Sequence, residues 1–406
     1  MDGCRRRTYQ LFVAFFATCL LVFGLAVSSS SAKPKVQHGP AGLSFYKPPK
    51  QLPGHHHGDL IRWRTLRSGA ALKNASSNDL LLYRSVGLDG KPIAVSGALS
   101  VPKGKAPKGG WPIISWDHGT SGIADRCAPT RSRAGSSVDG LNSYIYPALN
   151  GWLKDGYAVL RTDYEGLGTP GPHPYLIGKS AGHSTLDIVT AAQQLEPSLG
   201  KKVAIAGHSQ GGHAAIWAAG IAPNWTPDIH VVATVAFAPA SHLAEQLPVV
   251  RAIPAPGGGL GGIVSMILRA SDSSYPSLHV PSLLGPEATD LYPQTNTRCL
   301  NGLSKSGSFG GIPLNEILLS DADVTALSAK LAKNNPGGFD LKKPLRIEQG
   351  DNDTTVFPNY TNDLQNELVA NGSKSTLKTY PGVDHGSVVT GDPLADANAF
   401  LKKKLK

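Results

Sequence analysis

A chain of 406 residues, with 41% hydrophobic and 17% charged residues, can bury a large core, and this composition excludes global disorder. The length allows one large domain with an insertion, or two domains. The net charge is +10, but the basic residues are scattered rather than clustered with aromatic ones, so a nucleic-acid-binding surface is not predicted.

The chain begins with a segment typical of a secretory signal peptide. Arg5 to Arg7 precede an uncharged apolar run, Leu11–Val27, which small residues follow. This order predicts that residues 1–32 are a signal peptide cleaved after Ala32, and that the protein is secreted. The apolar run is also long enough for an uncleaved membrane anchor, which is the alternative.

Cysteine usage fits an exported protein. Removal of residues 1–32 would leave only Cys127 and Cys299. Two cysteines in an exported chain most simply pair as one disulfide, and two separate buried thiols are the alternative.

Residues 33–58 are rich in proline, lysine and glycine, which predicts an extended N-terminal arm. The arm ends near His55–His57. We expect exposed loop histidines here, because three consecutive side chains cannot all face one metal ion on regular structure. A β-meander follows, with a hairpin turn at Asp89-Gly90 and strands at Leu60–Arg64, Leu80–Val86 and Ile93–Val101.

Strands and helices then alternate, which predicts an α/β fold with a mostly parallel central sheet flanked by helices. The predicted strands are Trp111–Trp116, Tyr157–Thr162, Val203–Ala206, Val231–Phe237, Leu345–Glu348 and Thr376–Tyr380. The predicted helices are Tyr146–Lys154, Ser184–Leu195 and Gly212–Ala219.

The alternation stops between residues 243 and 340, where proline- and glycine-rich loops separate helical runs such as Ile263–Leu268 and Leu314–Leu331. We predict a cap of residues 243–340 inserted into a core of residues 59–242 and 341–406. A separate domain is less favoured, because about a hundred residues with few regular strands would not easily bury a core of their own.

The sequence around Ser209 predicts a strand, a tight turn and a helix in succession. The apolar run Val203–Ala206 leads into Gly207-His208-Ser209-Gln210-Gly211 and then into small residues typical of a helix. A serine on such a turn has strained backbone geometry, so the residues two before and two after it must lack side chains. The helix start offers free N–H groups to an oxyanion. Ser209 is therefore the predicted nucleophile.

A serine nucleophile needs a base and a carboxylate that orients the base. In enzymes with this turn the chain order is Ser, then Asp or Glu, then His. Asp353 follows the predicted strand 345–348 and is the chosen acid, with Asp351 as the alternative. His385 is the last histidine of the chain, in a loop after the last strand, and is the predicted general base.

An oxyanion hole needs two N–H donors. One is expected from the backbone of Gln210, directly after the nucleophile, and the other from Thr120, in the loop after strand 111–116. The chain carries no metal-binding motif, so neither a metal nor another cofactor is predicted.

Several motifs together resemble the secretory lipase family of α/β-hydrolases, whose fungal members are lipase A-type enzymes. They are Phe45-Tyr46-x-Pro48-Pro49, His118-Gly119-Thr120, Cys127-Ala128-Pro129, Asp163-Tyr164-Glu165-Gly166-Leu167-Gly168 and Gly207-His208-Ser209-Gln210-Gly211-Gly212. The resemblance runs from about Phe45 to Phe400. It implies an α/β-hydrolase core under a largely helical cap, hydrolysis of triacylglycerols and other carboxylic esters, and a Cys127–Cys299 disulfide that ties the oxyanion loop to the cap.

The sequence thus predicts a secreted serine carboxylic ester hydrolase, in the first place a triacylglycerol lipase acting through an acyl-enzyme. A short-chain carboxylesterase or an acyltransferase on the same triad is the alternative, and a non-catalytic binding protein is less favoured. The predicted partner is an ester or lipid substrate, with transient contact at a lipid interface left open. No obligate protein partner is implied. The apolar segment Leu260–Leu268 would line an acyl tunnel or belong to the core of the cap.

Overall fold

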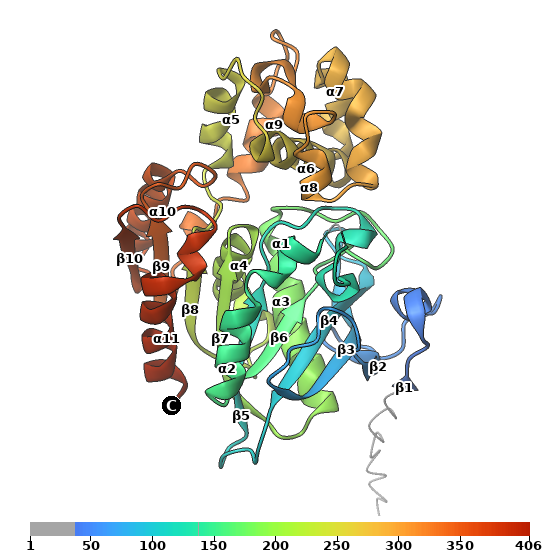
Figure 1. Cartoon of the computed structure of the whole chain (residues 1–406), viewed down its shortest axis with the longest axis vertical. Helices are drawn as coiled ribbons and strands as arrows, with labels where there is room; N and C mark the ends of the chain where they lie inside the picture. The colour runs from blue at the N-terminus through green and yellow to red at the C-terminus, as the bar shows by residue number, and fades with distance from the viewer. Residues whose placement is uncertain (1–36, 137) are drawn as a thin grey trace, which may run out of the picture. The chain divides into compact units, whose positions relative to one another are not determined.

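The computed structural model describes residues 37–136 and 138–406, so the predicted signal peptide lies outside the described residues. The described chain forms a ten-stranded sheet in the order β1-β2-β3-β4-β6-β5-β7-β8-β9-β10 (Figure 1). The strands are β1 (Gln37–His38), β2 (Leu60–Thr65), β3 (Ala75–Val86), β4 (Pro92–Pro102), β5 (Trp111–Asp117), β6 (Ala158–Thr162), β7 (Leu199–His208), β8 (His230–Phe237), β9 (Leu345–Gly350) and β10 (Ser375–Tyr380).

The sheet changes from antiparallel to parallel at β6. Strands β2, β3 and β4 form the predicted meander, and β4 pairs antiparallel with β6. All neighbours from β6 to β10 are parallel. The hairpin between β3 and β4 turns at Gly90, whose φ of 79° favours glycine. Since the carboxyl ends of parallel strands meet at one edge, the residues after β5, β7, β9 and β10 are brought to the same edge of the sheet.

Helices cover both faces of the sheet. Neighbouring residues of β6 alternate between the two faces. Leu160 belongs to an apolar cluster that includes residues of α3 and α4, and Val159 belongs to one that includes residues of α2 and α11. The helices of the core are α1 (Asp139–Ser143), α2 (Tyr146–Lys154), α3 (Gly178–Leu195), α4 (Gln210–Trp225), α10 (Pro358–Ala370) and α11 (Gly391–Leu405).

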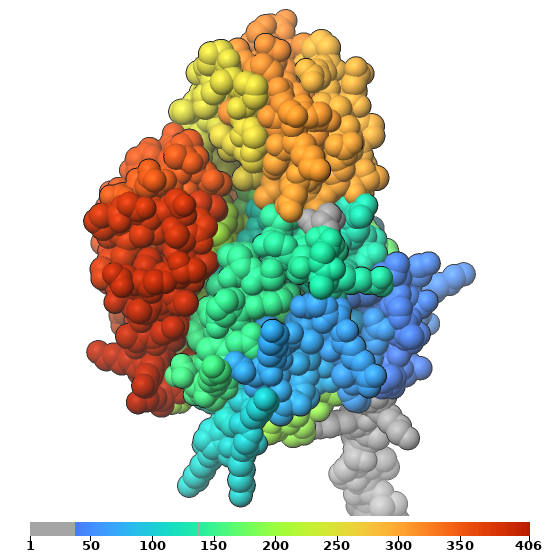
Figure 2. Space-filling view, in the orientation of Figure 1, coloured from blue at the N-terminus to red at the C-terminus, as the bar shows by residue number. Residues whose placement is uncertain are grey.

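A largely helical segment separates β8 from β9. Its helices are α5 (Leu243–Arg251), α6 (Gly259–Ser274), α7 (Pro286–Leu291), α8 (Leu300–Leu303) and α9 (Thr325–Ala332). Buried side chains of this segment, including Met266 on α6 and Phe309 between α8 and α9, form one apolar cluster that also contains Ile123 and Tyr175 from loops of the core. Figure 2 shows this segment in yellow and orange. The predicted fold class, an α/β core with an inserted helical cap, is confirmed.

Two predicted helices differ from the structure. Helix α3 begins at Gly178 rather than Ser184, because Gly178 has no side chain to collide with Trp217 of α4. The predicted helix Leu314–Leu331 is a short 3₁₀ turn followed by α9. Asp323 interrupts it by accepting a hydrogen bond from the backbone N–H of Thr325, where α9 begins.

Candidate active site

The turn between β7 and α4 holds Ser209 in a backbone conformation rare for a residue with a side chain, with φ 59° and ψ −116°. A Cβ atom at Gly207 would lie 2.0 Å from the carbonyl oxygen of Gly211, and one at Gly211 would lie 1.9 Å from that of Asp117. The N–H of Ser209 donates to Phe237 of β8 at 2.9 Å. The turn is therefore packed so closely that both glycines are required, and Ser209 is held at its tip.

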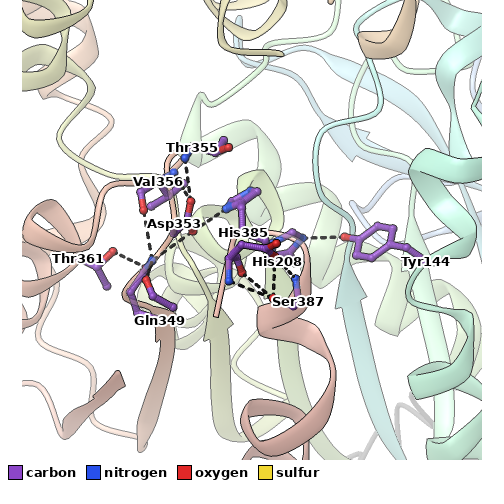
Figure 3. A network of polar contacts seen from close by, with 11 residues as sticks. Tyr144, His208, Gln349, Asp353, Thr355, Val356, Thr361, His385 and Ser387 are labelled. Carbon is purple, nitrogen blue, oxygen red and sulfur yellow. Dashed lines mark hydrogen bonds and ion pairs between the residues drawn. The ribbon is translucent and has the colours of Figure 1, made fainter. Parts of the chain in front are cut away.

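Asp353 and His385 lie together at the same edge of the sheet (Figure 3). The Nδ1 atom of His385 lies 2.7 Å from Oδ2 of Asp353, and the N–H groups of Thr355 and Val356 donate to Oδ1 at 2.8 Å. The side-chain amide of Gln349 adds a bond to Oδ2 at 3.2 Å. Burial alone would raise the pKa of Asp353, but the hydrogen bond from His385 and these donors hold it below its ordinary value. The carboxylate is thus kept ionised and aimed at the imidazole.

The carboxylates of Asp351 and Asp384, which lie near Asp353 and His385 in the sequence, contact other groups. Asp351, the alternative orienting acid, is exposed and accepts the N–H of Gly382 at 2.6 Å. Asp384 accepts the N–H and the hydroxyl of Ser387. Neither carboxylate bonds to His385 in the described part of the chain.

The imidazole ring of His385 lies beside the nucleophile turn. Its ring centroid is 4.6 Å from that of His208, the residue before Ser209. Among the described residues, no hydrogen bond joins Ser209 to His385. Such bonds are often long in a ligand-free site and shorten when substrate binds.

The two predicted oxyanion donors, Gln210 and Thr120, lie in two different segments of the chain. Gln210 begins α4, and Thr120 lies in the loop after β5, where its hydroxyl is 2.6 Å from that of Tyr175. In the described chain, the backbone N–H groups of Gln210 and Thr120 donate to no protein acceptor. Both are therefore available to a ligand.

A histidine that sequence analysis did not single out holds the side chain of Gln210. His173 Nδ1 lies 2.8 Å from the carbonyl oxygen of Glu165, so this nitrogen carries the proton. Its Nε2 then accepts from the amide of Gln210 at 3.0 Å. Burial lowers the pKa of His173 to about 4, so the ring is neutral at physiological pH. No local sequence pattern predicts this contact, because His173 and Gln210 are distant in sequence and only the tertiary fold brings them together.

A narrow, mostly apolar cavity of about 80 Å³ opens at Ser209. Besides Ser209, core residues Tyr175, Leu176, Ala240, Thr355 and Val356 form part of its wall, and helices of the cap form the rest. The cap residues that line it are Leu243, Gln246, Leu247, Val250, Leu260, Ile263, Val264, Ile267, Leu268, Leu327 and Leu331. The predicted segment Leu260–Leu268 therefore faces the nucleophile turn through this cavity.

A disulfide joins Cys127, in the loop that follows the Thr120 segment, to Cys299 at the start of α8. Gly122 pairs with Cys299 as an isolated β-bridge. A Cβ atom at Gly122 would lie 2.6 Å from the sulfur of Cys127. The loop carrying Thr120 is thus attached covalently to the cap.

The three histidines of the N-terminal arm, His55 to His57, differ in exposure. His55 and His56 are exposed, whereas His57 is partly buried against Asp187, 2.6 Å away. Within residues 37–136 and 138–406, no group of three or more His, Cys, Asp or Glu side chains is arranged to hold a metal ion. In the same residues, no helix is long and apolar enough to cross a membrane.

Comparison with known proteins finds similarity to proteins described as lipases. A family model described as secretory lipase matches residues 140–302. A Mycobacterium tuberculosis protein described as a probable inactive lipase is 26% identical over 249 residues, which cover 59% of this chain and 53% of that protein. Lipase A of Moesziomyces aphidis is 25% identical over 237 residues, which cover 56% and 49%. The chain spans about half the length of these relatives.

Among solved structures, Candida antarctica lipase A in its closed state is similar with a TM-score of 0.75. The alignment covers 89% of this chain and 85% of that one, at 19% sequence identity. At this identity the similarity shows the fold alone.

Proposed function

We propose that this relative of the secretory lipases is a secreted serine carboxylic ester hydrolase, in the first place a triacylglycerol lipase. The observation that carries the proposal is the pairing of His385 with Asp353, 2.7 Å apart, beside a strained serine turn at the mouth of an apolar cavity. A buried carboxylate that orients an imidazole near a serine is the arrangement that nucleophilic acyl transfer requires.

In the proposed mechanism, Ser209 attacks the ester carbonyl while Nε2 of His385 accepts the hydroxyl proton. Asp353 holds Nδ1–H of the same ring and stabilises the imidazolium that forms. The N–H groups of Gln210 and Thr120 stabilise the oxyanion. His385 then protonates the leaving alcohol and, as a base, activates the water that hydrolyses the acyl-enzyme.

The cavity supports an acyl-chain substrate. Most of its wall is aliphatic, and α6 and α9 contribute branched residues to it. Burial of a methylene group in such a wall contributes about 0.8 kcal/mol. An acyl chain would therefore gain affinity here, which supports an ester with an apolar acyl group as the substrate of either a lipase or a carboxylesterase.

A non-catalytic binding protein is the second candidate, because one relative is described as a probable inactive lipase. A hydrolase fold that only binds does not need an ionised acid aimed at a histidine. The retention of Ser209, Asp353 and His385 in one site therefore favours catalysis.

The test is hydrolysis of p-nitrophenyl esters from acetate to palmitate, and of emulsified triolein, by the protein and its Ser209→Ala variant. Hydrolysis of long-chain esters and triolein that the variant loses would support a serine lipase. Hydrolysis confined to short chains would favour an esterase, and alcohol acceptors in the assay would reveal acyl transfer. If both proteins were inactive but bound fatty acyl ligands equally, the binding protein would be the better description.

A further inference from the structure

His208 precedes the proposed nucleophile and contacts the loop of His385. Its Nε2 atom lies 2.9 Å from the backbone carbonyl oxygen of His385, and its Nδ1 atom lies 2.8 Å from the hydroxyl of Tyr144 (Figure 3). Tyr144 follows α1, so this chain of contacts joins three separate parts of the core. We propose that His208 and Tyr144 are positioning residues that hold His385 in register with Ser209. The inference rests on the proposed hydrolase function.

The proton positions in this network follow from its partners. A carbonyl oxygen can only accept, so Nε2 of His208 carries the proton and donates a hydrogen bond to the backbone carbonyl of His385. Burial and the neighbouring His385 lower the pKa of His208 to about 3, so the ring is neutral. Nδ1 is then an acceptor, and the Tyr144 hydroxyl donates to it. Both ring nitrogens of this buried histidine are satisfied in one orientation only.

The loop that carries His385 needs such a support. Residues 381–386 form turns after β10, and most of them are exposed. Asp351 holds the loop at Gly382, and Ser387 holds it at Asp384. His208 adds a bond at the carbonyl of His385 itself, directly from the turn that carries Ser209. A shift of the base by about 1 Å can cost about a hundredfold in rate, so this link bears on catalysis.

The neutral state of His208 also has an electrostatic consequence. During the reaction His385 becomes positively charged, and a second positive ring 4.6 Å away would oppose this. The charged or titratable groups near His385 are Asp353, which bonds to it, Asp384, which precedes it, and His208. Because His208 stays neutral, it adds no positive charge beside the imidazolium that forms during the reaction.

The test compares His208→Phe, His208→Gln and Tyr144→Phe with wild type in kcat, KM and the pH profile of kcat/KM on p-nitrophenyl butyrate. Phe removes the donor to His385, whereas the amide of Gln can replace Nε2–H. His213→Phe is a matched control. His213 is also buried and neutral on α4, with its Nε2 bonded to a carbonyl at 2.8 Å, that of Asn334. All variants are compared per folded molecule, with active sites counted by an organophosphate that labels Ser209.

We expect His208→Phe to lower kcat about tenfold or more with little change in KM. The pH profile of its kcat/KM should also change, because His385 is held less firmly against Asp353. Tyr144→Phe should show a smaller loss of kcat, His208→Gln should recover most of the rate, and His213→Phe should keep the wild-type profile. If the wild type is active and His208→Phe keeps the wild-type kcat and pH profile, the positioning inference is overturned and the proposed function stands. Equal losses of kcat in His208→Phe and His213→Phe would have the same meaning. An unlabelled, inactive wild type would overturn the proposed function and, with it, this inference.

Discussion

Asp351 and Asp353 lie two residues apart in the turn after β9, yet their carboxylates have different partners. Asp353 is buried and lies 2.7 Å from Nδ1 of His385, whereas Asp351 is exposed and accepts the N–H of Gly382. The structure therefore separates two candidates that the sequence left open. It also supplies a matched pair for mutagenesis.

Asp353→Asn should lower kcat on the order of 10³- to 10⁴-fold. In one orientation of the amide, its NH₂ would face the N–H donors of Thr355 and Val356. In the other, its NH₂ would face the Nδ1–H of His385, so the imidazole would lose the acceptor that orients it. Asp351→Asn keeps an oxygen for Gly382 and should retain the wild-type kcat. Steady-state kinetics on p-nitrophenyl butyrate check this, and equal losses in the two variants would contradict the assignment of Asp353.

Gly211→Ala should destabilise the fold by about 3 kcal/mol or more. Its Cβ would lie 1.9 Å from the carbonyl oxygen of Asp117 and 2.8 Å from that of His118, and both are backbone atoms that cannot rotate away. Gly151→Ala is the control, because a Cβ there, within α2, meets no atom within 4 Å. It should stabilise the protein by up to about 1 kcal/mol through helix propensity. Urea unfolding measures both, and a wild-type midpoint for Gly211→Ala would refute the packing argument.

The contrast between these sites shows what the sequence could predict. The positions of Ser209, Asp353 and His385 follow from local patterns, because each lies in the turn after a recognisable strand. The pairs Tyr144–His208 and His173–Gln210 are 64 and 37 residues apart in sequence, and only the tertiary fold brings them into contact. No periodicity or turn signal encodes such a contact.

The start of α3 differs from the prediction for a similar reason. Gly178 and Gly182 are poor helix formers, so local propensity places the helix start later. In the structure, a Cβ at Gly178 would collide with Trp217, and one at Gly182 would lie 3.2 Å from the backbone of Ala218. Close packing of α3 against α4 therefore overrides propensity, and it depends on a partner distant in the chain.

Ile263→Trp should change chain-length preference rather than abolish activity. Ile263 lines the cavity from α6, so an indole there would fill space that we assign to the acyl chain. We expect kcat/KM for the palmitate ester to fall about tenfold or more, with that for the acetate ester nearly unchanged. Val249→Trp is the control, because Val249 lies on α5 with 46% of its surface exposed. A parallel loss on both esters would contradict the acyl-chain assignment.

The pair of His57 and Asp187 should make stability depend on pH. The hydrogen bond to the buried Asp187 carboxylate raises the pKa of His57 above its ordinary value of 6.5. A raised folded-state pKa means that the charge-dependent stabilisation is fully present below pH 6.5 and is lost as the pH rises through the folded-state value. Because the imidazole is partly exposed, we expect this contribution to stay below about 1 kcal/mol.

The measurement is the free energy of unfolding of wild type minus that of His57→Phe, from urea titrations between about pH 6 and pH 9. Phe can keep the stacking of His57 on Trp225, whose ring centroid is 4.1 Å away, but it removes the bond to Asp187. The difference should be largest at the acidic end and shrink as the pH rises. Ser85 and Trp225 also donate to this carboxylate, so it keeps two partners in the variant. The exposed His56, whose backbone alone contacts Asp59, provides a control in His56→Phe. A difference that grows with pH for His57→Phe would show that the neutral ring, and not the charged one, stabilises the fold.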